Sequence, residues 1–396
     1  MEINTLRYRH PDHASRPMNI SVVLDRSGSM GEERKIEYAK QAVTALVDRL
    51  STNDYLSIVI YDDRVETLLP TRHVNDKAYI KRLVAEVYPR GSTNLGGGME
   101  EGFHQIERNF RREYVNRVIL LSDGLANQGI TDPSQLNRIA GRYRSHSISL
   151  STIGVGLDYN ENLMLGLAEQ GGGNYYFVES PGQLASIFDK ELNGLSCVVA
   201  QNATVELLLG NGVMLNNVVG CERRRDNEKW IIPIGDLYAN DHREITVLLT
   251  IPEGSGIKHI ASGVVRFDGD GGSERSSTGF SVDIHYSDDA ADLRKGKDWD
   301  TQGKVDIAVS TETVQRAMES LDAGRPAEAE EKLKAASHML QESGAIANSP
   351  IAAPMIRDQL KQLQGYANDL KDESTDKRRV KKSLQYYNYR QQKKKQ

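Results

Sequence analysis

The chain has 396 residues, which is enough for two or three domains that each bury a core of their own. Hydrophobic residues make up 38% of it and charged residues 27%, with a formal net charge of −5, a composition typical of a globular protein in water. This acidic balance argues against general affinity for nucleic acid or anionic membranes, so any basic site for a partner must be local.

No segment has the pattern of a targeting signal or a membrane span. The first 17 residues, MEINTLRYRHPDHASRP, contain no apolar run of signal-peptide length, and nowhere do about 18 apolar residues follow one another. We therefore expect a cytoplasmic protein. The cysteines Cys197 and Cys221 stand among apolar residues and outside any CxxC pair, which favours buried free thiols over a disulfide.

Residues 18–194 alternate between strand-like and helix-like segments. The runs NISVVLD, YLSIVIY, RVILLSD and SISLSTIGV are nearly continuous β-formers, which is typical of parallel strands covered on both faces. Between them, residues 35–50 place Ile36, Ala39 and Val43 on one helical face, and further helices are predicted near 76–87, 95–110 and 133–144. This alternation predicts an α/β domain built on a doubly wound, mostly parallel sheet.

Residues 195–287 change to short strands without helices between them. Segments such as ATVELLLG, KWIIPIG and KHIASGVVRF are separated by Gly, Asn and Asp turns, which predicts an antiparallel β-sandwich. Residues 1–17 form a separate N-terminal segment, and whether its NTLRYRH stretch adds a strand to the sandwich stays open. FDGDGGSE at 267–274 has Ser273 and Gly279 where a calcium-binding EF-hand needs Gly and Glu, so a hairpin turn is predicted there.

The last third of the chain is helical in pattern. Residues 288–300 form a charged linker, and residues 301–396 contain a helical hairpin that turns at Gly324 and Pro326, then helices from Ile351 to Leu370 and from Ser374 into the tail. The tail, DKRRVKKSLQYYNYRQQKKKQ, interleaves basic residues with tyrosines. We weigh a solvated or intramolecular helix first, docking to an acidic protein surface second, and binding of nucleic acid last.

Oxygen-bearing side chains gather where three segments of the α/β domain end or begin. In a doubly wound sheet, ligands bind outside the carboxyl ends of the strands. VVLDRSGSM, RGSTNLGGG and VILLSDG supply these candidate metal ligands at such positions: Asp25, Ser27, Ser29, Thr93 and Asp123. A set with hard oxygen donors and neither His nor Cys suits Mg²⁺, Mn²⁺ or Ca²⁺ rather than zinc.

These motifs, in this order, resemble the metal-ion-dependent adhesion site of the von Willebrand factor A family. The resemblance covers residues 17–193. It implies that Ser27, Ser29 and Thr93 contribute hydroxyls, while the two aspartates act largely through water or through hydrogen bonds to those hydroxyls. It also implies a switch that couples the metal site to the last helix of the domain, residues 180–194. Bacterial proteins with an A domain followed by a β-sandwich are similar in layout.

The function predicted from this resemblance is that of a non-enzymatic interaction module whose cation captures an acidic residue of a partner protein. One alternative is a structural subunit that assembles by filling its site with a neighbour's carboxylate. Another is a Mg²⁺-dependent hydrolase, for which Arg26 is the only strongly placed basic residue. Each motif also has a purely structural interpretation, because Ser29 with Glu32 could form a capping box and Asp123 with Gly124 a turn.

Overall fold

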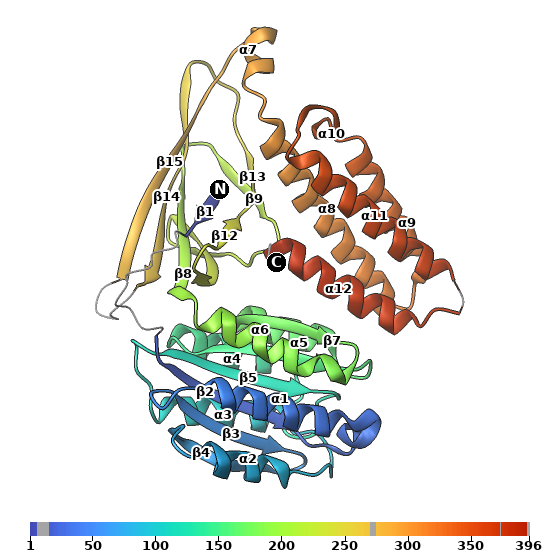
Figure 1. Cartoon of the computed structure of the whole chain (residues 1–396). Coiled ribbons are helices and arrows are strands. Elements are labelled where there is room, and N and C mark those ends of the chain that lie inside the picture. The colour runs from blue at the N-terminus through green and yellow to red at the C-terminus, as the bar shows by residue number, and fades with distance from the viewer. Residues whose placement is uncertain (6–15, 270–274, 373, 394–396) are drawn as a thin grey trace.

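The computed structural model describes residues 1–5, 16–269, 275–372 and 374–393. An α/β unit carries the candidate metal ligands, and an antiparallel β-region and a group of C-terminal helices lie side by side above it in Figure 1. The predicted fold class is confirmed: a mostly parallel sheet flanked by helices, with additional antiparallel strands and C-terminal helices. None of the described helices is both long enough and apolar enough to cross a membrane.

The central sheet has six strands in the order β4-β3-β2-β5-β6-β7. Their bounds are β2 Met18–Asp25, β3 Tyr55–Tyr61, β4 Val65–His73, β5 Val115–Ser122, β6 Ser149–Val155 and β7 Gly172–Val178. All neighbours pair in parallel except β3 and β4, which are antiparallel. Strands β2, β5 and β6 are buried along their whole length, which explains their unbroken apolar sequences.

Helices cover both faces of this sheet. The helical segments are η1 Gly28–Arg34, α1 Lys35–Arg49, α2 Lys77–Ala85, α3 Leu95–Glu107, α4 Pro133–Ser145, α5 Glu161–Gln170, η2 Pro181–Gln183 and α6 Leu184–Leu195. One apolar core joins α1, α2 and α6 to the sheet, and a second core on the opposite face joins α3, α4 and α5 to it. The sheet is therefore doubly wound, and the carboxyl ends of its parallel strands form one open edge.

The β-region consists of a five-stranded antiparallel sheet, in the order β10-β11-β8-β14-β15, and the two-stranded pairs β13-β9 and β1-β12. The bounds are β1 Glu2–Asn4, β8 Val198–Leu209, β9 Met214–Val218, β10 Arg224–Asp226, β11 Lys229–Tyr238, β12 His242–Glu244, β13 Val247–Thr250, β14 Ile257–Asp268 and β15 Arg275–His285. An apolar cluster joins Val205, Ile232 and Val265 of the large sheet to Val218 of β9. Residues 2–4 of the N-terminal segment thus add a strand here, whereas most of NTLRYRH lies outside the described residues.

The hairpin expected around FDGDGGSE is present as the pair β14-β15, in which Asp268 lies opposite Arg275. The turn at 270–274 itself lies outside the described residues. Two other expectations differ from the structure. The predicted linker at 288–300 includes a short helix, α7 Ala290–Lys295. Cys197, two residues after the end of α6, is free but exposed rather than buried, and Cys221 is free and half-buried.

The C-terminal helices are α8 Trp299–Asp322, α9 Pro326–Gln341, α10 Ala345–Asn348, α11 Ala352–Lys371 and α12 Lys377–Lys393. Helices α8 and α9 form the predicted hairpin, with Gly324 in the left-handed conformation at φ 69°. Helix α12 contains most of the basic tail and crosses between the other C-terminal helices and the α/β unit (Figure 1). The described part of the tail is therefore an intramolecular helix.

Several basic side chains of α12 pair with acidic groups of this same chain. Lys382 is buried against Glu161 of α5, and Arg379 pairs with Glu179. The hydroxyl of Tyr389 is buried and accepts a hydrogen bond from the backbone N–H of Tyr175 at 3.2 Å. These residues meet acidic and aromatic groups of the α/β unit, and docking of the tail to a separate acidic protein surface stays a prediction.

Candidate metal centre

Three loops meet at the carboxyl edge of the sheet. Strands β2 and β5 are parallel neighbours, with Leu24 opposite Leu121, so Asp25 and Asp123 leave the sheet side by side. The loop before α3 bonds to the loop after β2, from Gly28 N to Gly91 O at 3.2 Å and from Arg90 N to Arg26 O at 2.7 Å. It also bonds to the loop after β5, from Asn127 N to Thr93 O at 3.1 Å. The topology therefore brings the three predicted motifs to one place.

Asp25 is fully buried and has a fixed orientation. One carboxylate oxygen accepts a hydrogen bond from the backbone N–H of Ser27 at 2.8 Å, and the other accepts one from the Ser122 hydroxyl at 2.7 Å. Burial raises the pKa of Asp25 to about 6, although these hydrogen bonds oppose the shift. A buried carboxylate of this kind is stabilised by a nearby positive charge.

The two serines of the first loop connect to the second aspartate. Ser29 Oγ donates to Asp123 Oδ1 at 2.8 Å, and Ser27 Oγ lies 3.2 Å from Ser29 Oγ. Because Ser29 has already used its only proton, Ser27 is the donor in the contact between them. The capping box is absent: Glu32 has non-helical backbone angles inside η1, and no side chain caps the start of that segment.

Thr93 approaches from the third loop. Its backbone N–H is held by Asn127 Oδ1 at 2.8 Å, and its side chain is buried. Its hydroxyl makes no hydrogen bond within the described part of the chain. A Cβ atom on Gly124 would lie 3.5 Å from Thr93 Oγ1 and 3.7 Å from Ser29 Oγ, so both hydroxyls flank this glycine. The absence of a side chain at 124 keeps the space beside them open.

Lys35 is the functional neighbour that the sequence motifs miss. It is the first residue of α1, is only 2% exposed, and places its Nζ 2.8 Å from Asp123 Oδ2. The signal that could have found it is helical spacing, because Lys35 shares a face with the buried Ala39 and Ala42. A lysine on the apolar face of a helix needs a buried partner.

Arg26, the basic residue considered for a hydrolase, is not directed at these hydroxyls. It is buried, with Nε 2.8 Å from Asp62 Oδ2 and one terminal nitrogen 3.1 Å from Glu66. Asp62 also pairs with Arg90 at 2.7 Å. These ion pairs engage the guanidinium of Arg26 and join the loop after β2 to Asp62 and to Glu66 of β4.

The donor set fits a hard divalent cation. All five candidate ligands offer oxygen, and the hydroxyl of the largely buried Thr93 makes no hydrogen bond among the described residues. Uncharged hydroxyls with two carboxylates nearby match the preference of Mg²⁺, Mn²⁺ and Ca²⁺ for oxygen ligands.

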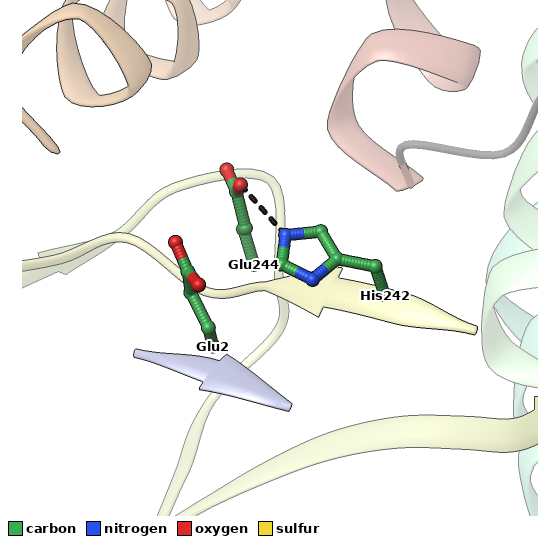
Figure 2. A group of neighbouring side chains, drawn as sticks. All are labelled: Glu2, His242 and Glu244. Carbon is green, nitrogen blue, oxygen red and sulfur yellow. Dashed lines mark hydrogen bonds and ion pairs between the residues drawn. The ribbon is translucent and has the colours of Figure 1, made fainter. Parts of the chain in front are cut away.

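A second group of metal-type side chains lies in the β-region. Figure 2 shows Glu2 of β1 beside His242 and Glu244 of β12, and ligand atoms of the three lie within 4.8 Å of one another. Lys304 of α8 places its ammonium 2.5 Å from Glu2 and 3.0 Å from Glu244. A cationic side chain thus already balances one of the two carboxylate charges of this group, and the ion pairs join the N-terminal strand to α8.

Comparison with known proteins identifies the α/β unit. Residues 19–190 match the family model of the von Willebrand factor type A domain. This part of the chain is a von Willebrand factor A domain. Such domains are modules of protein interaction and adhesion.

The curated relatives match part of this chain and are longer than it. The uncharacterized protein YfbK of Escherichia coli is 28% identical over 241 residues, which are 59% of this chain and 42% of that protein. Inter-alpha-trypsin inhibitor heavy chain H4 of Bos taurus is 27% identical over 212 residues, 49% of this chain and 23% of that protein. The chain spans less than half the length of these curated relatives.

Solved structures share the fold beyond the A domain. A von Willebrand factor type A protein from Catenulispora acidiphila matches with a TM-score of 0.73 and 17% identity, over 96% of this chain and 90% of that one. The ArnB paralog VWA2 from Sulfolobus acidocaldarius matches with a TM-score of 0.58 and 19% identity over the same shares of the two chains. The arrangement of A domain, β-region and C-terminal helices thus occurs in other proteins.

Proposed function

We propose that the A domain binds Mg²⁺, with Mn²⁺ or Ca²⁺ as alternatives, and uses the bound cation to capture an acidic residue of a partner protein. Ser27, Ser29 and Thr93 hold the cation through their hydroxyls. Asp25 and Asp123 act through water or through hydrogen bonds to those hydroxyls. The bound cation supplies a Lewis-acidic position that an incoming carboxylate can occupy.

The observation that carries this proposal is the arrangement of the three hydroxyls. The hydroxyls of Ser27 and Ser29 lie in a chain of hydrogen bonds that ends on Asp123, and that of Thr93 is left without a partner in the described structure. A hydroxyl that makes no hydrogen bond within the described residues, on a side chain that is largely buried beside two carboxylates, suits a cation ligand.

The interaction role is supported by the family and by the surroundings of the site. The A domain family consists of interaction modules, and the relatives include inhibitor heavy chains. The hydrolase alternative needs a basic residue free to contact phosphate, whereas Arg26 is engaged by Asp62 and Glu66. We therefore favour a non-enzymatic module.

Calorimetric titration of EDTA-treated protein with Mn²⁺ and Mg²⁺ tests the metal site. Wild type is expected to show saturable binding, and Thr93→Ala to weaken it by about tenfold or more because a ligand is lost. Thr44→Ala, on the half-buried surface of α1 away from this edge, is the matched control and is expected to match wild type. Failure of the wild-type protein to take up either ion would overturn the proposal.

The partner's carboxylate is tested separately. Immobilised protein is expected to retain a partner in Mg²⁺ and to release it in EDTA, with Thr93→Ala retaining none. The captured partner should then lose binding when its acidic residues at the interface are replaced by amides. Light scattering distinguishes the self-assembling subunit, which would form Mg²⁺-dependent oligomers that Thr93→Ala disperses.

A further inference from the structure

Lys35 places an ammonium group beside the candidate metal centre. Its ammonium lies 2.8 Å from Asp123 Oδ2, and its side chain is excluded from water. No residue of the proposed ligand set is a lysine, so this charge is additional to that set. A buried ammonium is costly unless it is paired, and Asp123 supplies its ion pair within the described structure.

The surroundings hold this charge in place. Lys35 begins α1, and a Cβ atom on Gly156, which follows β6, would lie 3.4 Å from Lys35 Cε and 3.6 Å from Nζ. The ammonium is therefore enclosed by the start of α1, the end of β5 and the end of β6. Because Asp123 uses its other oxygen for Ser29, the lysine and the hydroxyl network meet on a single carboxylate.

The charges at the site then have a simple sum. Two ionised aspartates and one lysine give a net charge of −1, from the residue types at 25, 123 and 35. A divalent cation changes this sum to +1, and a partner's carboxylate returns it to zero. Without the lysine, the loaded site would already be neutral and the partner's carboxylate would leave it negative. In a site of low dielectric, such a difference of one charge affects binding strongly.

We propose that Lys35 tunes this site by weakening its affinity for the cation while strengthening the affinity of the loaded site for a carboxylate. This inference rests on the proposed function. It assigns Lys35 a role in specificity, since a loaded site with net positive charge selects anionic partners.

Lys35→Met removes the charge and keeps an unbranched side chain. We expect the variant to bind Mn²⁺ about tenfold more tightly than wild type in calorimetric titration, because a like charge near the cation is gone. Acetate is the carboxylate probe: relaxation of water protons by the bound Mn²⁺ reports its binding, and we expect weaker acetate binding to the loaded variant. Lys40→Met is the matched control, since Lys40 lies on the same helix and pairs with Glu37 at 3.0 Å outside the site.

Three results separate the two proposals. Tighter Mn²⁺ binding and weaker acetate binding by Lys35→Met, with Lys40→Met like wild type, support the role of Lys35. Equal Mn²⁺ affinities or equal acetate affinities in wild type and Lys35→Met would overturn that role while the metal site stands. Absence of Mn²⁺ binding in both proteins would overturn the metal site and this inference together.

Folding is checked by circular dichroism in EDTA. If Lys35→Met does not fold, Lys35→Gln replaces it, because its amide can still donate a hydrogen bond to Asp123, and the same changes in affinity are expected. Lys35→Arg keeps the charge, so its affinities for Mn²⁺ and for acetate are expected to stay close to those of wild type.

Discussion

Asp123 divides its two carboxylate oxygens between partners of different kinds. One oxygen accepts the Ser29 hydroxyl proton and the other pairs with the Lys35 ammonium, each at 2.8 Å. Asp25 is likewise held by the backbone N–H of Ser27 and the hydroxyl of Ser122, with the Tyr61 hydroxyl as a more distant donor at 3.4 Å. Because both carboxylates are oriented in advance, little side-chain entropy remains to be lost when a cation binds.

Ser122→Ala tests this orientation at the level of one hydrogen bond. The buried carboxylate of Asp25 would lose its donor at 2.7 Å, and the free energy of unfolding in EDTA is expected to fall by about 1–3 kcal/mol. Urea unfolding measures the change. Ser186→Ala removes an exposed hydroxyl on α6 and is expected to leave the midpoint nearly unchanged. If both variants unfold at the wild-type midpoint, Ser122 does not support Asp25.

Residues differ in how well sequence reasoning can find them. Asp25, Ser27 and Ser29 stand out because they alternate directly after an apolar strand. Lys35 belongs to an ordinary amphipathic helix, and its partner Asp123 is 88 positions away in sequence. Its role depends on a contact between α1 and the end of β5, which no local pattern records.

The helix α6 is tied to the sheet by charges rather than by apolar contacts alone. Glu191 is fully buried, with Oε1 3.6 Å from the Arg117 guanidinium of β5 and Oε2 accepting from the Tyr176 hydroxyl at 2.6 Å. Arg117 also pairs with Asp236 of β11 at 2.7 Å. The last helix of the A domain and the β-region thus share one buried arginine.

Glu191→Gln is expected to lower the free energy of unfolding at pH 7 by about 3–5 kcal/mol, because the buried arginine loses a charged partner. Burial by itself raises the pKa of Glu191, but the Arg117 charge and the hydrogen bonds lower it more, so the pKa lies below its ordinary value of 4.5. A lowered folded-state pKa stabilises the fold above that ordinary value and loses this effect as the pH falls.

Urea unfolding between pH 7 and pH 3 measures both effects. Wild type is expected to lose stability below the ordinary pKa of 4.5, and Glu191→Gln to lose less over that range because the titrating group is gone. Glu37→Gln, at a partly exposed pair on α1, is the control. Identical pH profiles for wild type and Glu191→Gln would contradict the assignment.

Elements were predictable where their pattern was strong. The buried strands β2, β5 and β6 and the helices α1 and α8 follow apolar periodicity, and sequence alone locates them. The edge strand β4 was not predicted, because its sequence VETLLPTRH contains Pro70 and mixes polar with apolar residues, as edge strands do. The three-residue strands β1 and β12 are too short for a period to appear, and only their pairing defines them.

At the scale of the whole molecule, α12 holds the parts of the chain together. Its Lys382 ammonium lies near the ring of Tyr159 at 4.0 Å from the centroid and donates to the Tyr159 carbonyl. Further along, Arg243 of β12 donates to the carbonyl of Lys393 at 3.1 Å. One helix thereby contacts both the A domain and the β-region, and Figure 1 shows it lying against the A domain on its way toward the β-strands.

Sequence composition left this role open, because a basic helix rich in tyrosine suits several partners. The surface that α12 packs against includes Glu161 and Tyr175. These residues lie more than 200 positions before their partners in α12 and contact them only in the folded chain. Tyr389 is the buried aromatic contact between α12 and the A domain. It is 3% exposed, and its ring packs edge to face on that of Tyr175 at 5.8 Å between centroids. Edge-to-face pairs of this kind stabilise beyond their buried area.

Tyr389→Ala is therefore expected to detach α12 from the A domain, since loss of a large buried ring costs about 3–5 kcal/mol. Limited trypsin digestion measures the detachment, because Lys381 and Lys382 are shielded while the helix is docked. Faster cleavage at these lysines is expected in Tyr389→Ala. Tyr389→Phe keeps the ring and loses only the hydroxyl that accepts from Tyr175, so it should be cleaved nearly as slowly as wild type. Equal cleavage rates for wild type and Tyr389→Ala would mean that the charges of α12, and not its aromatic contact, hold the molecule together.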